Sequence, residues 1–224
     1  MTRIKICGLT NLADARFAAL SGADLLGFVF YPKSPRYIEA LAARAITREL
    51  QREFPAVRYV GLFVDEPLDF VRGVVEVCGL DLVQLHGHET PDALAALDGR
   101  AFRAIRPRSA AEAEEALTAY GTRSAPPDLL VDTYSALKPG GTGEVGDWEI
   151  AARIARQRSI LLAGGLTPQN VGEAIRRVNP WGVDVSSGVE SEPGQKSHQA
   201  IVDFVAAVRT ASRGRHVSKQ PHSL

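Results

Sequence analysis

Short apolar runs alternate with longer amphipathic stretches along the whole chain. The short runs predict eight strands, at Arg3–Leu9, Leu25–Phe30, Tyr59–Val64, Leu82–His86, Ala101–Arg106, Leu129–Thr133, Ile160–Ala163 and Gly182–Val185. Helical periodicity between them predicts helices at Leu12–Ser21, Glu39–Phe54, Leu68–Cys78, Pro91–Leu97, Ala110–Tyr120, Trp148–Arg156, Pro168–Val178 and His198–Ala211. Strands separated by helices pair in parallel through right-handed crossovers. The pattern therefore predicts an α/β fold.

Eight strand–helix units in 224 residues match a closed (β/α)8 barrel, or TIM barrel, at the compact end of its size range. A doubly wound open sheet is the competing architecture. The barrel is favoured because no Gly-x-Gly-x-x-Gly follows the first strand and the eighth unit is complete. We expect a single catalytic barrel domain over residues 1–211. Residues 212–224 are polar and aperiodic, which predicts a disordered C-terminal tail.

Composition and charge exclude several classes of protein. The 26 Lys and Arg residues balance 26 Asp and Glu residues, so neither a nucleic-acid binder nor a polybasic membrane anchor is indicated. Two cysteines do not build a disulfide-rich secreted scaffold. The N-terminus lacks the apolar segment of a signal peptide, and no apolar stretch approaches the about 18 residues of a membrane span. We expect a cytoplasmic enzyme without nucleic-acid or membrane partners.

Glycine-containing segments follow the last two predicted strands. Gly164 and Gly165 follow the seventh, and Ser186, Ser187 and Gly188 close the eighth. Glycine lets the backbone approach a ligand, and the loops after strands seven and eight are the usual phosphate site of a barrel. Each segment alone is equally typical of an ordinary strand-to-helix connection. Together they favour phosphate binding.

A third glycine-rich segment, at residues 138–143, follows the sixth predicted strand. It is too long for a minimal connection, and we interpret it as a mobile loop that folds over a ligand and excludes water. An excursion on the surface is the alternative.

Two residues at strand ends are candidates for acid–base chemistry. Cys7 shares a strand face with Lys5, and this face is predicted to be the barrel interior because the opposite, helix-facing side must be apolar. A reactive thiol and a small buried residue fit this position about equally. Asp132 follows three apolar residues, so partial desolvation should favour its protonated form, with capping of the next turn as the alternative.

Two further side chains are candidates for contacts with a ligand or a metal. Arg36, after the second predicted strand, either clamps a carboxylate or is a surface arginine. His86 has only His88 nearby and no carboxylate cluster at ligand spacing, so no metal site is predicted.

Six segments in register resemble one family. They are residues 5–10 (KICGLT), 27–38 (GFVFYPKSPRYI), 84–87 (QLHG), 140–143 (GGTG), 164–171 (GGLTPQNV) and 184–190 (DVSSGVE). Together they resemble phosphoribosylanthranilate isomerase of the tryptophan pathway, from residue 4 to about residue 205. The resemblance implies an Amadori rearrangement, in which N-(5-phosphoribosyl)anthranilate becomes 1-(2-carboxyphenylamino)-1-deoxyribulose 5-phosphate by general acid/base catalysis.

The resemblance also implies roles for residues. Cys7 matches the general base, Asp132 the general acid, and Arg36 the residue that meets the anthranilate carboxylate. No metal or organic cofactor is implied, and the expected partner is a phosphorylated aminosugar substrate. The chain is compatible with either a monomer or a homodimer. The remaining expected substrate contacts lie in the matched glycine-containing segments and are Gly141, Gly164, Gly165, Ser186, Ser187 and Gly188.

The sequence departs from the family pattern after the glycine-rich segment. Residues 143–148 read Gly-Glu-Val-Gly-Asp-Trp, where the family usually has Gly-Lys-x-Phe-Asp-Trp. Gly146 thus replaces an aromatic residue that would help to pack the loop, and Glu144 replaces a lysine.

Two other enzyme classes are alternatives to the isomerase. A ribulose-phosphate epimerase would need a His/Asp metal set that the five histidines do not supply, and an indole-glycerol-phosphate synthase would place catalytic Lys and Glu at strand ends. A non-catalytic barrel that binds phosphorylated ligands is the third possibility.

Overall fold

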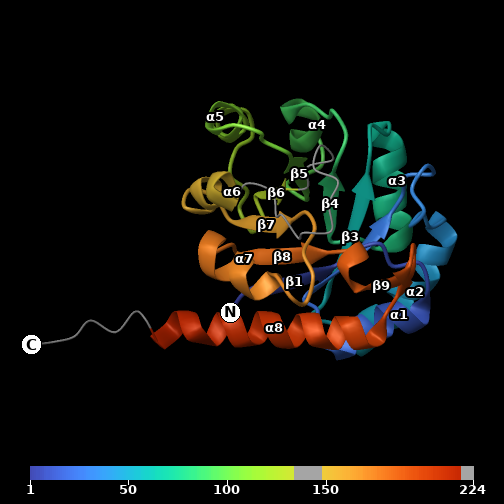
Figure 1. Ribbon diagram of the computed structural model, residues 1–224. Coiled ribbons are helices and arrows are strands. Elements are labelled where there is room, and N and C mark those ends of the chain that lie inside the picture. Colours follow the sequence, from blue (N-terminus) through green and yellow to red (C-terminus); the bar gives the residue numbers. More distant parts are fainter. Residues whose placement is uncertain (134–147, 218–224) are drawn as a thin grey trace, which may run out of the picture.

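Eight parallel strands close into a barrel in the computed structural model, which describes residues 1–133 and 148–217. Strand β1 pairs with β2 on one side and with β8 on the other, so the predicted barrel is confirmed and the open sheet is wrong. Figure 1 shows the helices arranged around the strands. The strands are β1 (Arg3–Ile6), β2 (Leu25–Val29), β3 (Arg58–Phe63), β4 (Leu82–Leu85), β5 (Ala101–Ile105), β6 (Leu129–Asp132), β7 (Ile160–Ala163) and β8 (Gly182–Val185).

A helix follows each strand. The helices are α1 (Leu12–Leu20), α2 (Ala40–Glu53), α3 (Leu68–Cys78), α4 (Pro91–Ala95), α5 (Ala110–Ala119), α6 (Trp148–Ala155), α7 (Val171–Val178) and α8 (His198–Val217). Between β8 and α8 the chain also forms a short 3-10 helix, η1 (Ser187–Val189), and a hairpin of β9 (Glu190–Glu192) and β10 (Gln195–Lys196), which the hydrophobic pattern did not predict.

Successive side chains of each strand point to opposite faces of the sheet, and this alternation produces two hydrophobic cores. Ile4 and Ile6 of β1 pack in the larger core between the barrel and the helices. The smaller core contains Leu25, Leu82, Phe102 and other residues of alternate strand positions, and it fills the barrel interior. Lys5 is fully buried on the interior face, so the predicted orientation of β1 is confirmed.

Helix α7 begins later than predicted. The hydroxyl of Thr167 accepts a hydrogen bond from the Gln169 backbone N–H, and the Thr167 N–H donates to the Asn170 side chain. These bonds hold residues 167–170 in a turn, and the helix starts only at Val171 with Asn170 as its N-cap. Thr167 therefore closes the loop after β7 instead of capping the helix.

The last helix extends past the predicted domain boundary at Ala211. Ser212 is buried, and its hydroxyl bonds to the Val208 carbonyl and to the Thr2 hydroxyl near the N-terminus. Ser212 thus pairs with the barrel, whereas Arg213 is exposed, and α8 continues to Val217, so the boundary expected after residue 211 falls inside a helix. Residues 218–224 lie outside the described part of the chain. None of the described helices is both long and apolar enough to span a membrane.

Candidate active site

A cavity of about 620 Å³ opens at the C-terminal ends of the barrel strands. This is the size of typical small-molecule sites, and in (β/α)8 barrels this end carries the active site. The structure brings all the described candidate residues to its wall, whereas Gly141 lies outside the described residues. These residues are Cys7, Arg36, Asp132, Gly164, Gly165, Ser186, Ser187 and Gly188.

Cys7 lies one residue beyond β1, where its backbone N–H donates to the Val185 carbonyl at 2.9 Å. Its sulfur lies against Gly27 of β2, since a Cβ at that glycine would come within 2.9 Å of Sγ and 3.1 Å of the Lys5 ammonium. A side chain at position 27 would therefore separate or displace the thiol and the ammonium. The missing side chain makes room for both groups beneath the cavity.

The Lys5 ammonium is a buried positive charge beside the thiol. Its Nζ donates to Asp184 Oδ1 at 3.0 Å, and the two residues are direct neighbours across β1 and β8. Burial alone would lower the pKa of Lys5, but the charges of Asp184 and Cys7 outweigh it and raise that pKa. Lys5 therefore stays protonated, with its ammonium beside the Cys7 sulfur.

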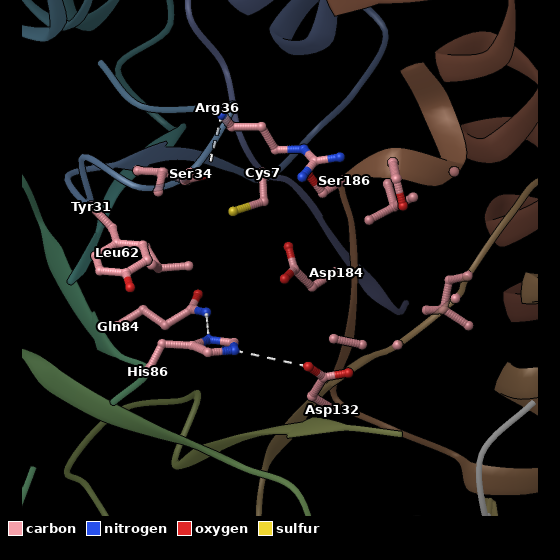
Figure 2. A pocket seen from close by; sticks show the side chains of 18 of the residues that line it. Cys7, Tyr31, Ser34, Arg36, Leu62, Gln84, His86, Asp132, Asp184 and Ser186 are labelled. Atoms are coloured by element: carbon pink, nitrogen blue, oxygen red, sulfur yellow. Dashed lines mark hydrogen bonds and ion pairs between the residues drawn. The ribbon is translucent and has the colours of Figure 1, made fainter. Parts of the chain in front are cut away.

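Asp132 ends β6 and belongs to a polar chain that crosses the cavity (Figure 2). Arg106 Nε donates to Asp132 Oδ2 at 2.8 Å, and Arg106 Nη2 lies 2.7 Å from His86 Nε2. His86 Nδ1 lies in turn 2.9 Å from Gln84 Nε2. Burial, and then the charge of Arg106, lowers the pKa of His86 to about 4, so this imidazole is neutral at neutral pH.

Figure 2 shows the Asp184 carboxylate between Cys7 and Asp132. The strand order gives the reason. Strands β6, β7, β8 and β1 are consecutive neighbours in the barrel, so β8 lies between β6 and β1. A ligand in the cavity can thus face the thiol and the Asp132 carboxyl at once.

The loops after β7 and β8 meet at the cavity. Gly164 and Gly165 have φ angles of 97° and 65°, which favour glycine. Gly188 packs so closely on this loop that a Cβ there would lie 1.9 Å from the Leu166 carbonyl oxygen. The Ser186 hydroxyl is buried and has no hydrogen-bond partner within the described part of the chain. The two loops therefore form one compact seat, beside which the Ser186 hydroxyl is left unpaired.

Arg36 reaches the cavity from the loop after β2. Its side chain crosses Gly8, whose φ of 75° and lack of a Cβ leave the space, and its guanidinium pairs with Glu190. Arg36 thus lines the cavity, and its ion pair with Glu190 is a feature that the sequence did not predict.

Comparisons with known proteins show the family of the chain. The profile of a family described as N-(5'-phosphoribosyl)anthranilate (PRA) isomerase matches residues 4–207. A protein of Geobacter sp. (strain M21) named N-(5'-phosphoribosyl)anthranilate isomerase is 49% identical over 212 residues, which cover 95% of this chain and 100% of that protein. The chain belongs to the phosphoribosylanthranilate isomerase family. The resemblance read from the sequence is thereby confirmed, and with it the assignment as an enzyme of this family.

Solved structures of phosphoribosylanthranilate isomerases have the same fold. The crystal structure of the enzyme from Thermotoga maritima superposes with a TM-score of 0.84 at 41% identity and covers 94% of this chain and 100% of its own. A phosphoribosylanthranilate isomerase in complex with reduced 1-(o-carboxyphenylamino)-1-deoxyribulose 5-phosphate has a TM-score of 0.81 at 40% identity, covering 94% and 100% of the two chains.

Sequence reasoning missed several charged residues around the site of this phosphoribosylanthranilate isomerase family member. Asp184 lies within a segment that matches the family but indicates no role for it, and Arg106 is predicted only as the end of a strand. Glu190 and Lys196 lie in a hairpin with no hydrophobic alternation to mark it. Within residues 1–133 and 148–217 no group of His, Cys, Asp and Glu side chains is arranged to hold a metal ion.

Proposed function

We propose that the protein converts N-(5-phosphoribosyl)anthranilate into 1-(2-carboxyphenylamino)-1-deoxyribulose 5-phosphate, an Amadori rearrangement in tryptophan biosynthesis. The observation that carries the proposal is the placement of Cys7 and Asp132 on one cavity wall beside a glycine-lined seat for a phosphate. The cavity also holds Arg36, which suits the second anionic group of this substrate, its carboxylate.

Binding at both ends positions the sugar between the two catalytic groups. The loops with Gly164, Gly165 and Ser186–Gly188 take the phosphate through backbone N–H groups and the Ser186 hydroxyl. Arg36 takes the anthranilate carboxylate on the other side of Cys7. Fixing both ends turns proton transfer into an intramolecular step.

Ring opening is the first chemical step. Asp132 donates a proton to the furanose oxygen, the C1–O bond breaks, and the nitrogen lone pair forms the iminium. Asp132 must carry a proton to do this, and the carboxylate now accepts from Arg106. The Arg106 side chain is 61% exposed, so the entering substrate can displace it into solvent.

Proton abstraction at C2 is the second step. The iminium makes the C2 proton acidic, and the Cys7 thiolate removes it to give the enolamine, which tautomerises to the aminoketose. The Lys5 ammonium lies beneath Cys7, next to the sulfur that takes this proton. General acid and general base catalysis each contribute typically ~10²–10⁴-fold, and no bound metal or organic cofactor takes part in these steps.

The decisive experiment follows the loss of N-(5-phosphoribosyl)anthranilate fluorescence with purified protein, together with identification of the product. We expect catalytic turnover to the aminoketose phosphate. Binding of the aminoaldose without turnover would instead identify a non-catalytic phosphate-binding barrel, and a different product would identify another phosphosugar enzyme.

A further inference from the structure

Three charged side chains form a fixed network at the rim of the cavity. Arg36 donates to both oxygens of Glu190, from Nε at 2.8 Å and from Nη2 at 2.6 Å. Lys196 donates to Glu190 Oε1 at 2.8 Å and to the Ser186 carbonyl at 3.2 Å. Glu190 is thus held from two sides, and its side chain is only 5% exposed.

The hairpin between η1 and α8 sets the position of Glu190. Glu190 in β9 and Lys196 in β10 are direct cross-strand partners, so the hairpin register brings their side chains together. The Lys196 backbone N–H donates to Asp14 of α1 at 2.9 Å, and Thr10 Oγ1 donates to the Gly194 carbonyl at 2.6 Å. These bonds tie the hairpin to the start of the chain and leave Glu190 little freedom to move.

The network of Arg36, Glu190 and Lys196 carries a net positive charge. Burial alone would raise the pKa of Glu190, but the hydrogen bonds from Arg36 and Lys196 hold that pKa below its ordinary value. Two positive groups face one carboxylate, so one positive charge is left over. The side chain of Lys196 is fully buried, whereas that of Arg36 is partly exposed, so the excess charge is accessible to a ligand only at Arg36.

The hydrogen-bond geometry decides which edge of Arg36 meets a ligand. A guanidinium has five N–H donors in a planar fork. Glu190 accepts two of them, from Nε and Nη2, and no other side chain in the described part of the chain accepts from the rest. The remaining edge, formed by Nη1 and Nη2, is the one that binds a carboxylate with two parallel hydrogen bonds.

We propose that Glu190, held by Lys196, is a positioning residue that turns the free edge of Arg36 towards the anthranilate carboxylate. This inference rests on the proposed function. Without Glu190, Arg36 would retain its charge but lose its fixed orientation, so recognition of the carboxylate would weaken while the phosphate seat stays intact. A Glu190 that instead masked Arg36 would have the opposite effect, because its removal would strengthen carboxylate binding.

The test compares two stable ligands on the full-length enzyme. One is reduced 1-(2-carboxyphenylamino)-1-deoxyribulose 5-phosphate, and the other is the same compound with a phenyl group in place of the carboxyphenyl group. For Glu190→Gln we expect affinity for the carboxylated ligand to fall about tenfold or more, as for a lost charge-assisted hydrogen bond, and affinity for the phenyl ligand to change less than about twofold. With substrate, KM should rise far more than kcat falls. Glu190→Asp, which keeps the charge but shortens the reach, should show a smaller loss of the same selectivity.

Glu192→Gln on the same hairpin is the matched control, since Glu192 is exposed, and it should leave both affinities unchanged. If both Glu190 variants lost the same affinity for the two ligands, Glu190 would have only a structural role. If the variants bound the carboxylated ligand more tightly, Glu190 would mask Arg36 in the unmodified enzyme. Either result overturns the proposal. Failure of the unmodified enzyme to convert the aminoaldose would overturn the proposed function, which the wild-type assay reports separately from the selectivity of the variants.

Discussion

Residues of the same type have different roles here because their surroundings differ. Cys7 lies beside an ammonium and lines the cavity, whereas Cys78 lies in the core, where burial raises its thiol pKa to about 11. Asp132 lines the cavity with Arg106, whereas Asp65 accepts from the backbone of exposed His88 and lies outside the cavity. These pairs provide controls for tests of the site.

Replacing either proposed catalytic group should lower kcat without unfolding the protein. We expect Cys7→Ala and Asp132→Asn each to reduce kcat by ~10²–10⁴-fold, the usual contribution of one acid or base. Steady-state kinetics measure this loss, and Cys78→Ala and Asp65→Asn are the matched controls. A variant that kept near-normal turnover would remove its residue from the mechanism.

His86 should make stability depend on pH. Its pKa is lowered from 6.5 to about 4, so the unfolded chain binds a proton that the folded protein excludes between these values. The free energy of unfolding should therefore fall as pH decreases, by roughly 2 kcal/mol from this group between pH 7 and pH 5. Denaturant unfolding of His86→Gln should show a correspondingly smaller decrease over that range. A decrease in His86→Gln as large as that of the unmodified protein would contradict this assignment.

At the scale of elements, the loops after β7 and β8 act as a pair. The contact between Gly188 and the Leu166 carbonyl brings the start of η1 against the turn that precedes α7. The sequence predicted both loops from their glycines and their order. It did not predict this contact, because the contact depends on how β7 and β8 lie side by side.

Gly188→Ala should separate these two loops and weaken phosphate binding. The new Cβ would be 1.9 Å from a backbone oxygen, so the backbone must move. A displacement of this size should reduce kcat/KM on the order of 10- to 100-fold, mainly through KM. Gly73→Ala in α3, where a Cβ meets nothing within 4 Å, should leave the kinetics unchanged. If Gly188→Ala had the kinetics of the unmodified enzyme, phosphate binding would not depend on the close contact between the two loops.

At the scale of the whole molecule, the barrel closes where β1 meets β8, and a buried ion pair lies at this junction. The Lys5–Asp184 pair joins residues 179 positions apart in the sequence. It lies just below the cavity, so the same contact supports the fold and the proposed base.

Removing one partner of this ion pair should destabilise the protein more than replacing both partners. Lys5→Met leaves a buried carboxylate without its partner, and we expect the free energy of unfolding to fall by about 3–5 kcal/mol. The double variant Lys5→Met/Asp184→Asn should recover part of that loss. Chemical denaturation of the single and double variants gives the coupling energy, and additive effects would show that the pair contributes no coupling.

The sequence by itself determined the order of strands and helices, the closed barrel and the family. It also determined which residues stand at strand ends, including Cys7, Asp132 and the loop glycines, because periodicity and position along the chain fix these properties locally. The cytoplasmic location, the oligomeric state and the roles of single residues remain predictions.

Only the tertiary structure decided which charges meet. Arg36 and Glu190 are 154 positions apart in the sequence, and no local pattern links them. The pairing arises because barrel closure brings the loop after β2 next to the hairpin after β8. The same closure places Asp184 between Cys7 and Asp132, and the packing of α8 near the N-terminus brings Ser212 to Thr2. Long-range packing sets these contacts, and they in turn set the charge and orientation of the groups that local sequence had identified.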